Sequence, residues 1–189
     1  MATKLYLRNT QDNITGYYDL STVVGAGIDT CVTNTVVSGT EIQLTKTAGG
    51  STVAWISKAV GVAFTLTTTD ISLWQSESHV AANCGGRYRL FNYASATGIE
   101  TELLGGPFDE GAEMDNKYRE DTWTGNPTDT GFARGDRLVL KVYITNIGTM
   151  GAGRTCTLGF NAADAATGDS FLNINETITF LNRVWVSHY

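Results

Sequence analysis

The chain has 189 residues, of which 42% are hydrophobic and 17% are charged, and its formal net charge is -6. A chain of this length and apolar content can bury one substantial core, which excludes disorder throughout. The acidic balance offers no positive surface to phosphate backbones or anionic lipid, so we expect neither nucleic-acid nor membrane partners.

The first forty residues predict one short strand followed by an irregular segment. Residues 4–8 alternate in polarity, whereas residues 9–40 are polar, rich in Gly, Thr and Val, and alternate only weakly. We interpret residues 1–40 as an N-terminal strand and an extended arm. The alternation begins without a charged head and an apolar run, so we expect no secretory signal and synthesis in a host cytoplasm.

Residues 41–189 predict a single β domain, because period-two alternation dominates them. Further strands are expected at 41–47, 52–58, 87–93, 137–147, 154–160 and 176–186. In the clearest of these, one face carries Leu138, Leu140, Val142 and Ile144. No apolar run approaches the roughly 20 residues of a membrane span.

A change of parity within residues 62–73 predicts a bend. Val62, Phe64 and Leu66 occupy even positions, whereas Ile71 and Leu73 occupy odd ones. One regular strand cannot direct both sets inward, so a bulge or corner should fall near residues 68–70. Strands that bend in this way and are separated by turns favour an all-β fold, an antiparallel two-sheet β-sandwich of jelly-roll type.

The stretch ESHVAANCGGRYRLFNY, residues 77–93, combines a carboxylate, an imidazole and a thiol. A Cys–His nucleophile needs a third group that orients the base, and a zinc site needs about four ligands. His79 and Cys84 meet neither requirement, and the other histidine, His188, is penultimate. We interpret the stretch as the corner between two strands, with Asn83 in the turn, and expect no catalytic residue, metal or cofactor.

Three cysteines, Cys31, Cys84 and Cys156, lie far apart without metal-like spacing. An odd number of cysteines without a signal predicts reduced thiols. Cys156 shares a strand face with Leu158 and Phe160, as a small buried hydrophobe would.

Residues 105–136 form a long acidic excursion without clear periodicity, and such loops are usually functional or contain a short element. The carboxylates that could gather calcium, or supply an acid–base pair for glycoside cleavage, are Asp109, Glu110, Glu113, Asp115, Glu120 and Asp121. No Asp-x-Asn-x-Asp-Gly ladder fixes a calcium geometry, so we expect a solvated acidic loop.

Tryptophan placement separates core from surface. Trp55 and Trp74 lie in strand patterns and are expected in the core. Trp123, beside Tyr118 in the acidic excursion, either docks a partner or caps the core beneath the loop.

Several turn and strand motifs recur together in this chain. They are Glu77-Ser78, Ala81-Ala82-Asn83, Gly135-Asp136-Arg137-Leu138, Gly168-Asp169-Ser170 and Glu176-Thr177-Ile178-Thr179-Phe180. With the opening MATKLYLRN, this pattern resembles a module in small virion proteins of tailed bacteriophages, from about residue 52 to the C-terminus. The resemblance implies a jelly roll similar to carbohydrate-binding modules, used as a capsid decoration (cement) protein or another virion component, often trimeric. It implies no catalytic residues.

We therefore expect a non-enzymatic virion structural protein that binds the major capsid protein on the outer surface of a phage head as a homo-oligomer, in the resemblance a trimer. A second hypothesis is a carbohydrate-binding or receptor-binding module of a phage tail or spike. A third is a lyase or hydrolase built on a jelly roll. The residues expected at the interface are Tyr17, Tyr18, Val23, Val24, Tyr118 and Trp123.

Overall fold

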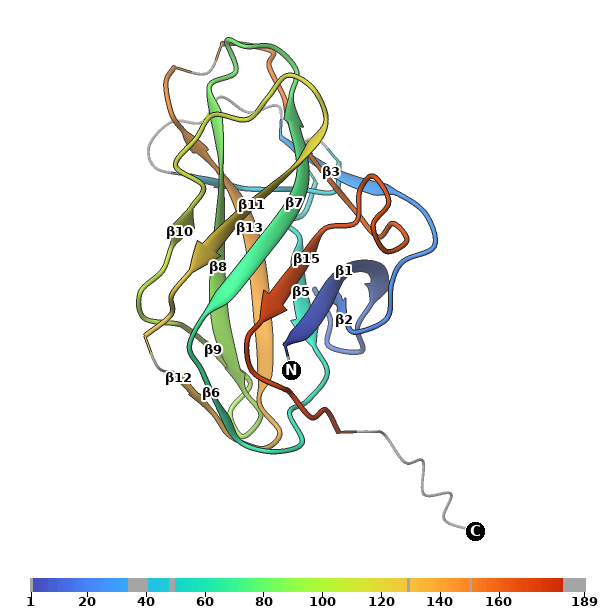
Figure 1. Cartoon of the computed structure of the whole chain (residues 1–189), viewed down its shortest axis with the longest axis vertical. Coiled ribbons are helices and arrows are strands. Elements are labelled where there is room, and N and C mark those ends of the chain that lie inside the picture. Colours follow the sequence, from blue (N-terminus) through green and yellow to red (C-terminus); the bar gives the residue numbers. More distant parts are fainter. Residues whose placement is uncertain (1, 34–40, 48–49, 129, 150, 182–189) are drawn as a thin grey trace.

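The computed structural model describes residues 2–33, 41–47, 50–128, 130–149 and 151–181 (Figure 1). These residues form strands and no helix, which confirms the all-β class. The strands are β1 (Thr3–Gln11), β2 (Tyr18–Ser21), β3 (Asp29–Thr33), β4 (Ile42–Gln43), β5 (Ala54–Ser57), β6 (Phe64–Leu66), β7 (Thr69–Glu77), β8 (Cys84–Ala94), β9 (Ile99–Glu102), β10 (Phe108–Asp109), β11 (Arg119–Gly125), β12 (Thr130–Phe132), β13 (Arg137–Asn146), β14 (Cys156–Phe160) and β15 (Phe171–Ile174). Within this part of the chain, nothing helical is long and apolar enough to cross a membrane.

Most strands belong to one hydrogen-bonded sheet with the order β10-β8-β13-β5-β2-β1-β15-β7-β14-β3. Strands β9, β4 and β11 join this path at β8, β13 and β7, whereas β6 and β12 form a separate pair. β2 and β5 run parallel, and the other pairs are antiparallel. The sheet is therefore mostly antiparallel.

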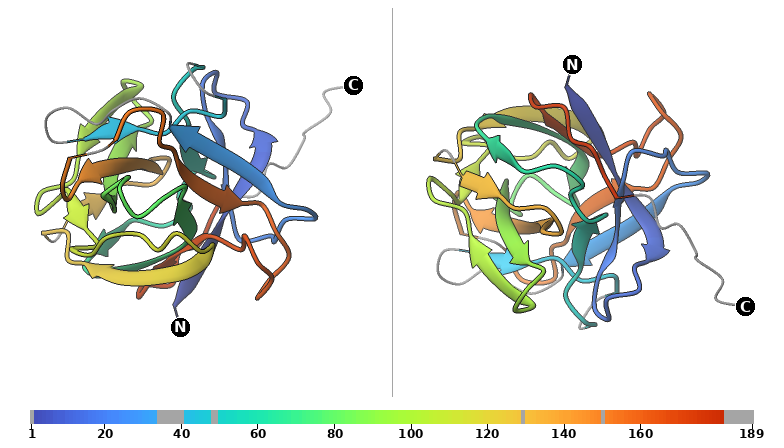
Figure 2. Two further views of the ribbon diagram at one scale, coloured as in Figure 1. Left: turned by 90° about the horizontal axis from the view of Figure 1, so that it is seen from above. Right: turned by 90° about the horizontal axis from the view of Figure 1, so that it is seen from below.

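The sheet curls, so that strands remote in its path face one another (Figure 2). Trp55 on β5 meets Phe160 on β14 with 5.3 Å between ring centroids, although β2, β1, β15 and β7 lie between these strands in the path. Tyr88 on β8 likewise contacts Trp123 on β11 at 5.9 Å. Removing these large aromatic surfaces from water stabilises the curled arrangement.

Two patterns read from the sequence are confirmed. The four apolar residues expected on one face of β13 are each at most 1% exposed; they are Leu138, Leu140, Val142 and Ile144. The parity change is also real, because β6 ends at Leu66, β7 starts at Thr69, and β6 pairs with β12 outside the main sheet. Trp55 is fully buried as predicted, whereas Trp74 is only half-buried.

The expected N-terminal arm differs from the structure. β1 pairs with β15 and β2, β2 pairs with β5, and β3 pairs with β14, so three segments of residues 3–33 belong to the sheet and are joined by short connections. β2 and β3 are short and bury few side chains, which explains their weak alternation in sequence. Residues 34–40, the end of the expected arm, lie outside the described part of the chain.

The acidic excursion at 105–136 also contains strands. β11 pairs with β7 over its whole length, while β10 and β12 pair with β8 and β6. β11 is polar because it covers the edge of β7 and leaves one of its own faces to solvent. Its cross-strand hydrogen bonds, and not an apolar pattern, define it as a strand.

The aspartates in the motifs that carry the phage resemblance stabilise turns. The Asp136 carboxylate accepts hydrogen bonds from the backbone amides of Ala133 (2.9 Å) and Ser95 (3.2 Å). The Asp169 carboxylate accepts from the amide of Ala165 (2.8 Å). Asp136 and Asp169 therefore stabilise the turns in which they lie.

Candidate functional site

The polar stretch after β7 is a corner between two strands, as predicted. β7 ends at Glu77, β8 begins at Cys84, and Asn83 has a left-handed φ of 51°. His79 is exposed, and its Nδ1 accepts a hydrogen bond from the backbone amide of Ala81 at 3.0 Å. The imidazole therefore stabilises its own turn. His188 and Trp185 lie outside the described residues.

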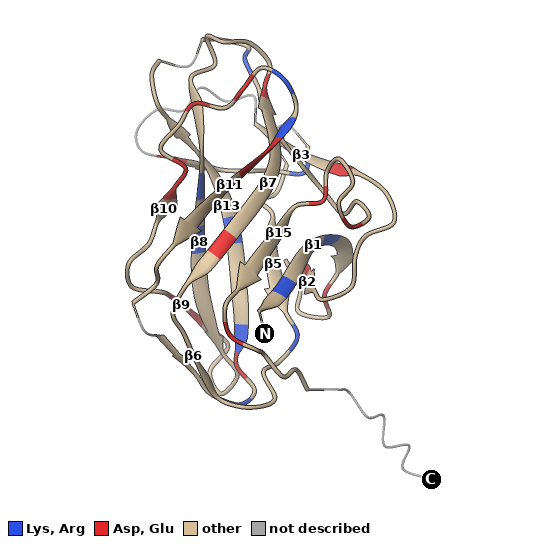
Figure 3. Ribbon diagram, viewed as in Figure 1, with Lys and Arg blue, Asp and Glu red and all other residues tan. Residues whose placement is uncertain are grey.

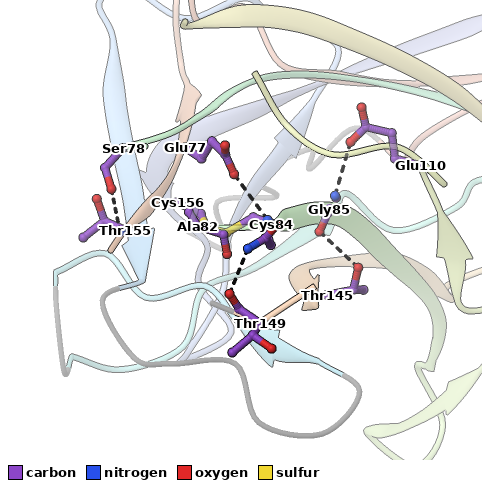
Figure 4. The surroundings of a disulfide bond; sticks show 12 residues. Glu77, Ser78, Ala82, Cys84, Gly85, Glu110, Thr145, Thr149, Thr155 and Cys156 are labelled. Atoms are coloured by element: carbon purple, nitrogen blue, oxygen red, sulfur yellow. Dashed lines mark hydrogen bonds between the residues drawn. A yellow bond between two sulfur atoms is a disulfide. The ribbon is translucent and has the colours of Figure 1, made fainter. Parts of the chain in front are cut away.

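The prediction of three reduced thiols is wrong for two of the cysteines. Cys84 at the start of β8 and Cys156 at the start of β14 form a disulfide, with 6.8 Å between their Cα atoms (Figure 4). They are 72 residues apart in sequence, but Cys156 lies opposite Glu77 at the end of β7, and the corner after Glu77 leads to Cys84. Cys31 remains a buried free thiol, and burial raises its pKa to about 12. Neither state provides a thiolate nucleophile.

Glu77 stabilises the same corner. Its carboxylate is 3% exposed and accepts a hydrogen bond from the amide of Cys84 at 3.3 Å (Figure 4). Burial raises the pKa of Glu77. It borders a hollow of about 270 Å³ with Glu113 and Asp115. Among the described residues, however, no group of three His, Cys, Asp or Glu side chains is arranged to hold a metal ion.

The carboxylates of the acidic excursion are more engaged than the expected solvated loop. The Oδ2 atom of Asp109 accepts a hydrogen bond from Arg87 Nη2 at 2.8 Å. Glu110 accepts from the Gln75 side chain at 2.6 Å and from the Gly86 amide at 3.2 Å. Three further contacts join Glu120 to Ser72, Asp121 to Arg119, and Asp115 to Arg119. Asp109, Glu110 and Glu120 therefore hold the excursion against β7 and β8, whereas the two Arg119 pairs lie within the excursion.

Two of the predicted interface aromatics, Tyr118 and Trp123, are half-buried. The Trp123 ring packs on the core and its Nε1 donates to the Phe108 carbonyl at 3.4 Å. Tyr118 contacts the Trp74 ring at 5.8 Å. Of the two alternatives for Trp123, capping of the core fits its position, and the pair provides no free aromatic platform.

Tyr17 and Tyr18, also predicted at the interface, are half-buried beside the β1–β2 connection. The Tyr17 hydroxyl donates to Glu100 at 2.6 Å, and its ring meets Tyr93 edge-on. Tyr18 packs against the core, with the Lys46 ammonium 5.3 Å from its ring centroid. Both tyrosines also border a hollow of about 310 Å³.

Val23 and Val24, the remaining predicted interface residues, lie in the connection from β2 to β3. Val23 is 60% exposed, and Ile28 in the same connection is 55% exposed. The Arg8 guanidinium donates to the carbonyls of Val23 (2.7 Å) and Val24. The loop backbone is thus held by hydrogen bonds while the side chains of Val23 and Ile28 are exposed.

Basic side chains on the outer face of the sheet are paired with carboxylates. β8 and β13 carry the positive residues of this face (Figure 3). The ion pairs are Arg87–Glu41 (3.0 Å), Arg89–Glu102 (2.7 Å) and Lys141–Glu100 (2.5 Å). The positive charges on this face are therefore neutralised by neighbouring carboxylates. These ion pairs help to fix the register of the strands and leave little positive charge for a ligand.

A hollow of about 730 Å³ lies at the end of β1, and reading the sequence did not find it. Its charged walls are Asp12, Asp19, Lys58 and Arg137, which come from separate segments. No local spacing links these residues. The sequence signals only that Asp12 precedes a turn, where its carboxylate accepts the Ile14 amide at 2.9 Å.

Comparison with known proteins gives a fold but no family. No protein-family model and no curated protein sequence matches the chain. Similar solved structures include an aminopeptidase from the marine sediment archaeon Thaumarchaeota archaeon (TM-score 0.62, 12% identity), an alpha-amino acid ester hydrolase (0.57, 10%) and a CocE/NonD family hydrolase from Staphylococcus aureus (0.58, 11%). The matches cover 92–95% of this chain but only 36–37% of those chains. Identities this low indicate shared architecture alone.

Proposed function

We propose that the chain is a non-enzymatic virion structural protein, a capsid decoration protein that binds the outer surface of a phage head as a homo-oligomer. Its body is proposed to be a two-sheet jelly-roll sandwich. The Trp55–Phe160 contact between remote strands supports two facing layers. The turn motifs around Asp136 and Asp169 support the virion reading through their resemblance to phage proteins.

The observation that carries this proposal is the rigid apolar loop between β2 and β3. Its backbone is anchored by the amide of Gly25, which donates to Ala162 (3.0 Å), and by the amide of Gly27, which donates to Asn161 (3.2 Å). The Asn161 side chain in turn donates to Gly27 and accepts from Arg8. The loop therefore already has a fixed shape, and a partner would not have to order it.

Fixed exposed apolar residues favour association. Burying one Val or Ile side chain contributes roughly 1.5–3 kcal/mol, and a preorganised loop loses little conformational entropy on binding. A capsid presents the same partner surface many times, so a modest contact around Val23 and Ile28 would be repeated over the lattice. Attachment through this loop replaces the expected arm, because residues 9–33 lie in or beside the sheet.

The disulfide agrees with this location. Disulfides persist on virion surfaces and other oxidising exteriors, and they are rare in a reducing cytoplasm. The Cys84–Cys156 bridge therefore supports a protein that is carried on the exterior of a released particle.

The test is binding of the purified protein to undecorated capsids, measured as copies per particle. We expect saturation at lattice symmetry, with hundreds of copies or so. Val23→Asp should weaken binding at least about tenfold, because a charge would be taken into an apolar contact. Val62→Asp is the matched control, since Val62 is 62% exposed but lies outside this loop. Equal binding by both variants would refute attachment through the loop.

The second candidate function is a carbohydrate-binding or receptor-binding module of a tail or spike. Tyr118 and Trp123 do not favour it, because both are half-buried. The hollow beside Asp12 does favour it. A tail component would be present in only a few copies per particle, so the same copy-number measurement separates the two candidates.

A further inference from the structure

The hollow beside Asp12 is built from a fixed ion pair. The Asp12 side chain, 9% exposed, lies 3.4 Å from Arg137 Nη1. The same Arg137 nitrogen donates to the Ser57 carbonyl at 3.1 Å, and Asp12 also accepts from the Ile14 amide. The two charged groups therefore cannot move independently, and they form a rigid polar wall.

Asp19 and Lys58 complete the charged part of the wall. Burial, and then the nearby Asp12 carboxylate, raise the pKa of Asp19. The Asp19 carboxylate presents acceptor oxygens to the hollow. Lys58 is exposed at the rim and provides a mobile donor.

The wall has balanced charge, with two acidic and two basic side chains. The two aspartates would repel a phosphate, and Lys58 and Arg137 would repel a polycation. The balanced charge therefore disfavours strongly charged ligands. Adjacent hydroxyl groups are suited to such a wall, because each can donate to a carboxylate and accept from a cation. The volume of about 730 Å³ lies in the range of small-molecule sites, roughly 300–1,000 Å³.

A second hollow extends this site across the β1–β2 connection. It shares Gln11 and Asp12 with the first hollow and adds Tyr17 and Tyr18. Both tyrosine rings are half-buried, so they add apolar edges to the hollow and not an open stacking face, while the polar walls take the hydroxyls. The two hollows share Gln11 and Asp12 in their walls, so a chain of linked rings would reach both, whereas a single compact ligand would occupy one.

We propose that the paired hollows around Asp12 bind a neutral saccharide chain. This proposal shares its ligand class, a carbohydrate, with the second candidate function on which it rests. It does not require the protein to be part of a tail. Asp12 and Arg137 form the fixed wall, Asp19 and Lys58 contact hydroxyls in the larger hollow, and Tyr18 borders the smaller one.

Saturation-transfer NMR tests the proposal with neutral glucose-, galactose- and N-acetylglucosamine-containing oligosaccharides. We expect signal transfer to at least one glycan class. Asp19→Asn and Lys58→Gln should each lower its affinity about tenfold, the loss of one charge-assisted hydrogen bond. Lys117→Gln is the matched control, since Lys117 is an exposed lysine remote in sequence from the hollow. Circular dichroism should show that all variants are folded.

Two results would overturn the proposal: no signal transfer to any of the oligosaccharides, or equal affinity of the two variants and the control. Capsid binding measured on the same proteins separates the two proposals. Asp19→Asn should lose glycan binding and keep capsid binding, whereas Val23→Asp should do the reverse.

Discussion

The Cys84–Cys156 disulfide permits the most quantitative prediction, in which the bridge is removed. The perturbation is reduction of the native protein, or the double variant Cys84→Ala/Cys156→Ala. A bridge stabilises mainly by restricting the unfolded chain, and the effect grows with the logarithm of the loop length. For a separation of 72 residues, the loop-closure relation gives about 4.4 kcal/mol at 25 °C.

That free energy corresponds to a large thermal shift. With an unfolding entropy of about 2.1 cal/mol/K per residue over 189 residues, the midpoint should fall by about 11 °C. The assay is thermal and urea unfolding with and without reductant, and Cys31→Ala is the control that retains the bridge. Alkylation of the denatured oxidised protein should modify one thiol, and three after reduction. Three modified thiols before reduction, or an unchanged midpoint after it, would show the reasoning to be wrong.

Two further predictions concern the covering strand β11 and its surroundings. Burial, and then Asp121, raise the pKa of Glu110, so its contribution to stability is present below its usual pKa and is lost as pH rises through the folded value. Glu110→Gln should therefore flatten the fall in the unfolding midpoint as pH rises above the usual pKa of a glutamate, whereas exposed Glu113→Gln should not. The buried Tyr118 hydroxyl has no hydrogen-bond partner among the described residues, so Tyr118→Phe should be neutral or stabilise by up to about 1 kcal/mol in urea unfolding. Gly159→Ala would place its Cβ 1.2 Å from that hydroxyl oxygen and should destabilise strongly, with a smaller loss in the Tyr118→Phe background; equal losses in both would contradict the contact.

Strands with an apolar face could be predicted from sequence, and polar strands could not. β13 and β8 alternate clearly because one face of each is buried. β11, in contrast, reads as a polar loop, although each of its residues from Arg119 to Gly125 pairs with β7. Its strand character comes from backbone hydrogen bonds, which leave no side-chain pattern.

The candidate sites show the same division. Exclusion of a Cys–His centre at His79 and Cys84 followed from the lack of further ligands, and the corner there is confirmed. The disulfide and the Asp12–Arg137 pair could not be inferred, because their partners are separated by 72 and 125 residues. Pairings across such distances depend on how the sheet curls.

The amino-acid sequence by itself determined the β class, the buried face of β13, the bend before β7 and the turns at Asp136 and Asp169. All of these depend on neighbours within a few residues, since side-chain alternation and turn chemistry are local. Only the tertiary structure decided which cysteines form the disulfide, which carboxylates form ion pairs and which valine side chains are exposed to solvent. Those outcomes depend on strands that are remote in the chain but face each other across the curled sheet, so no local pattern records them.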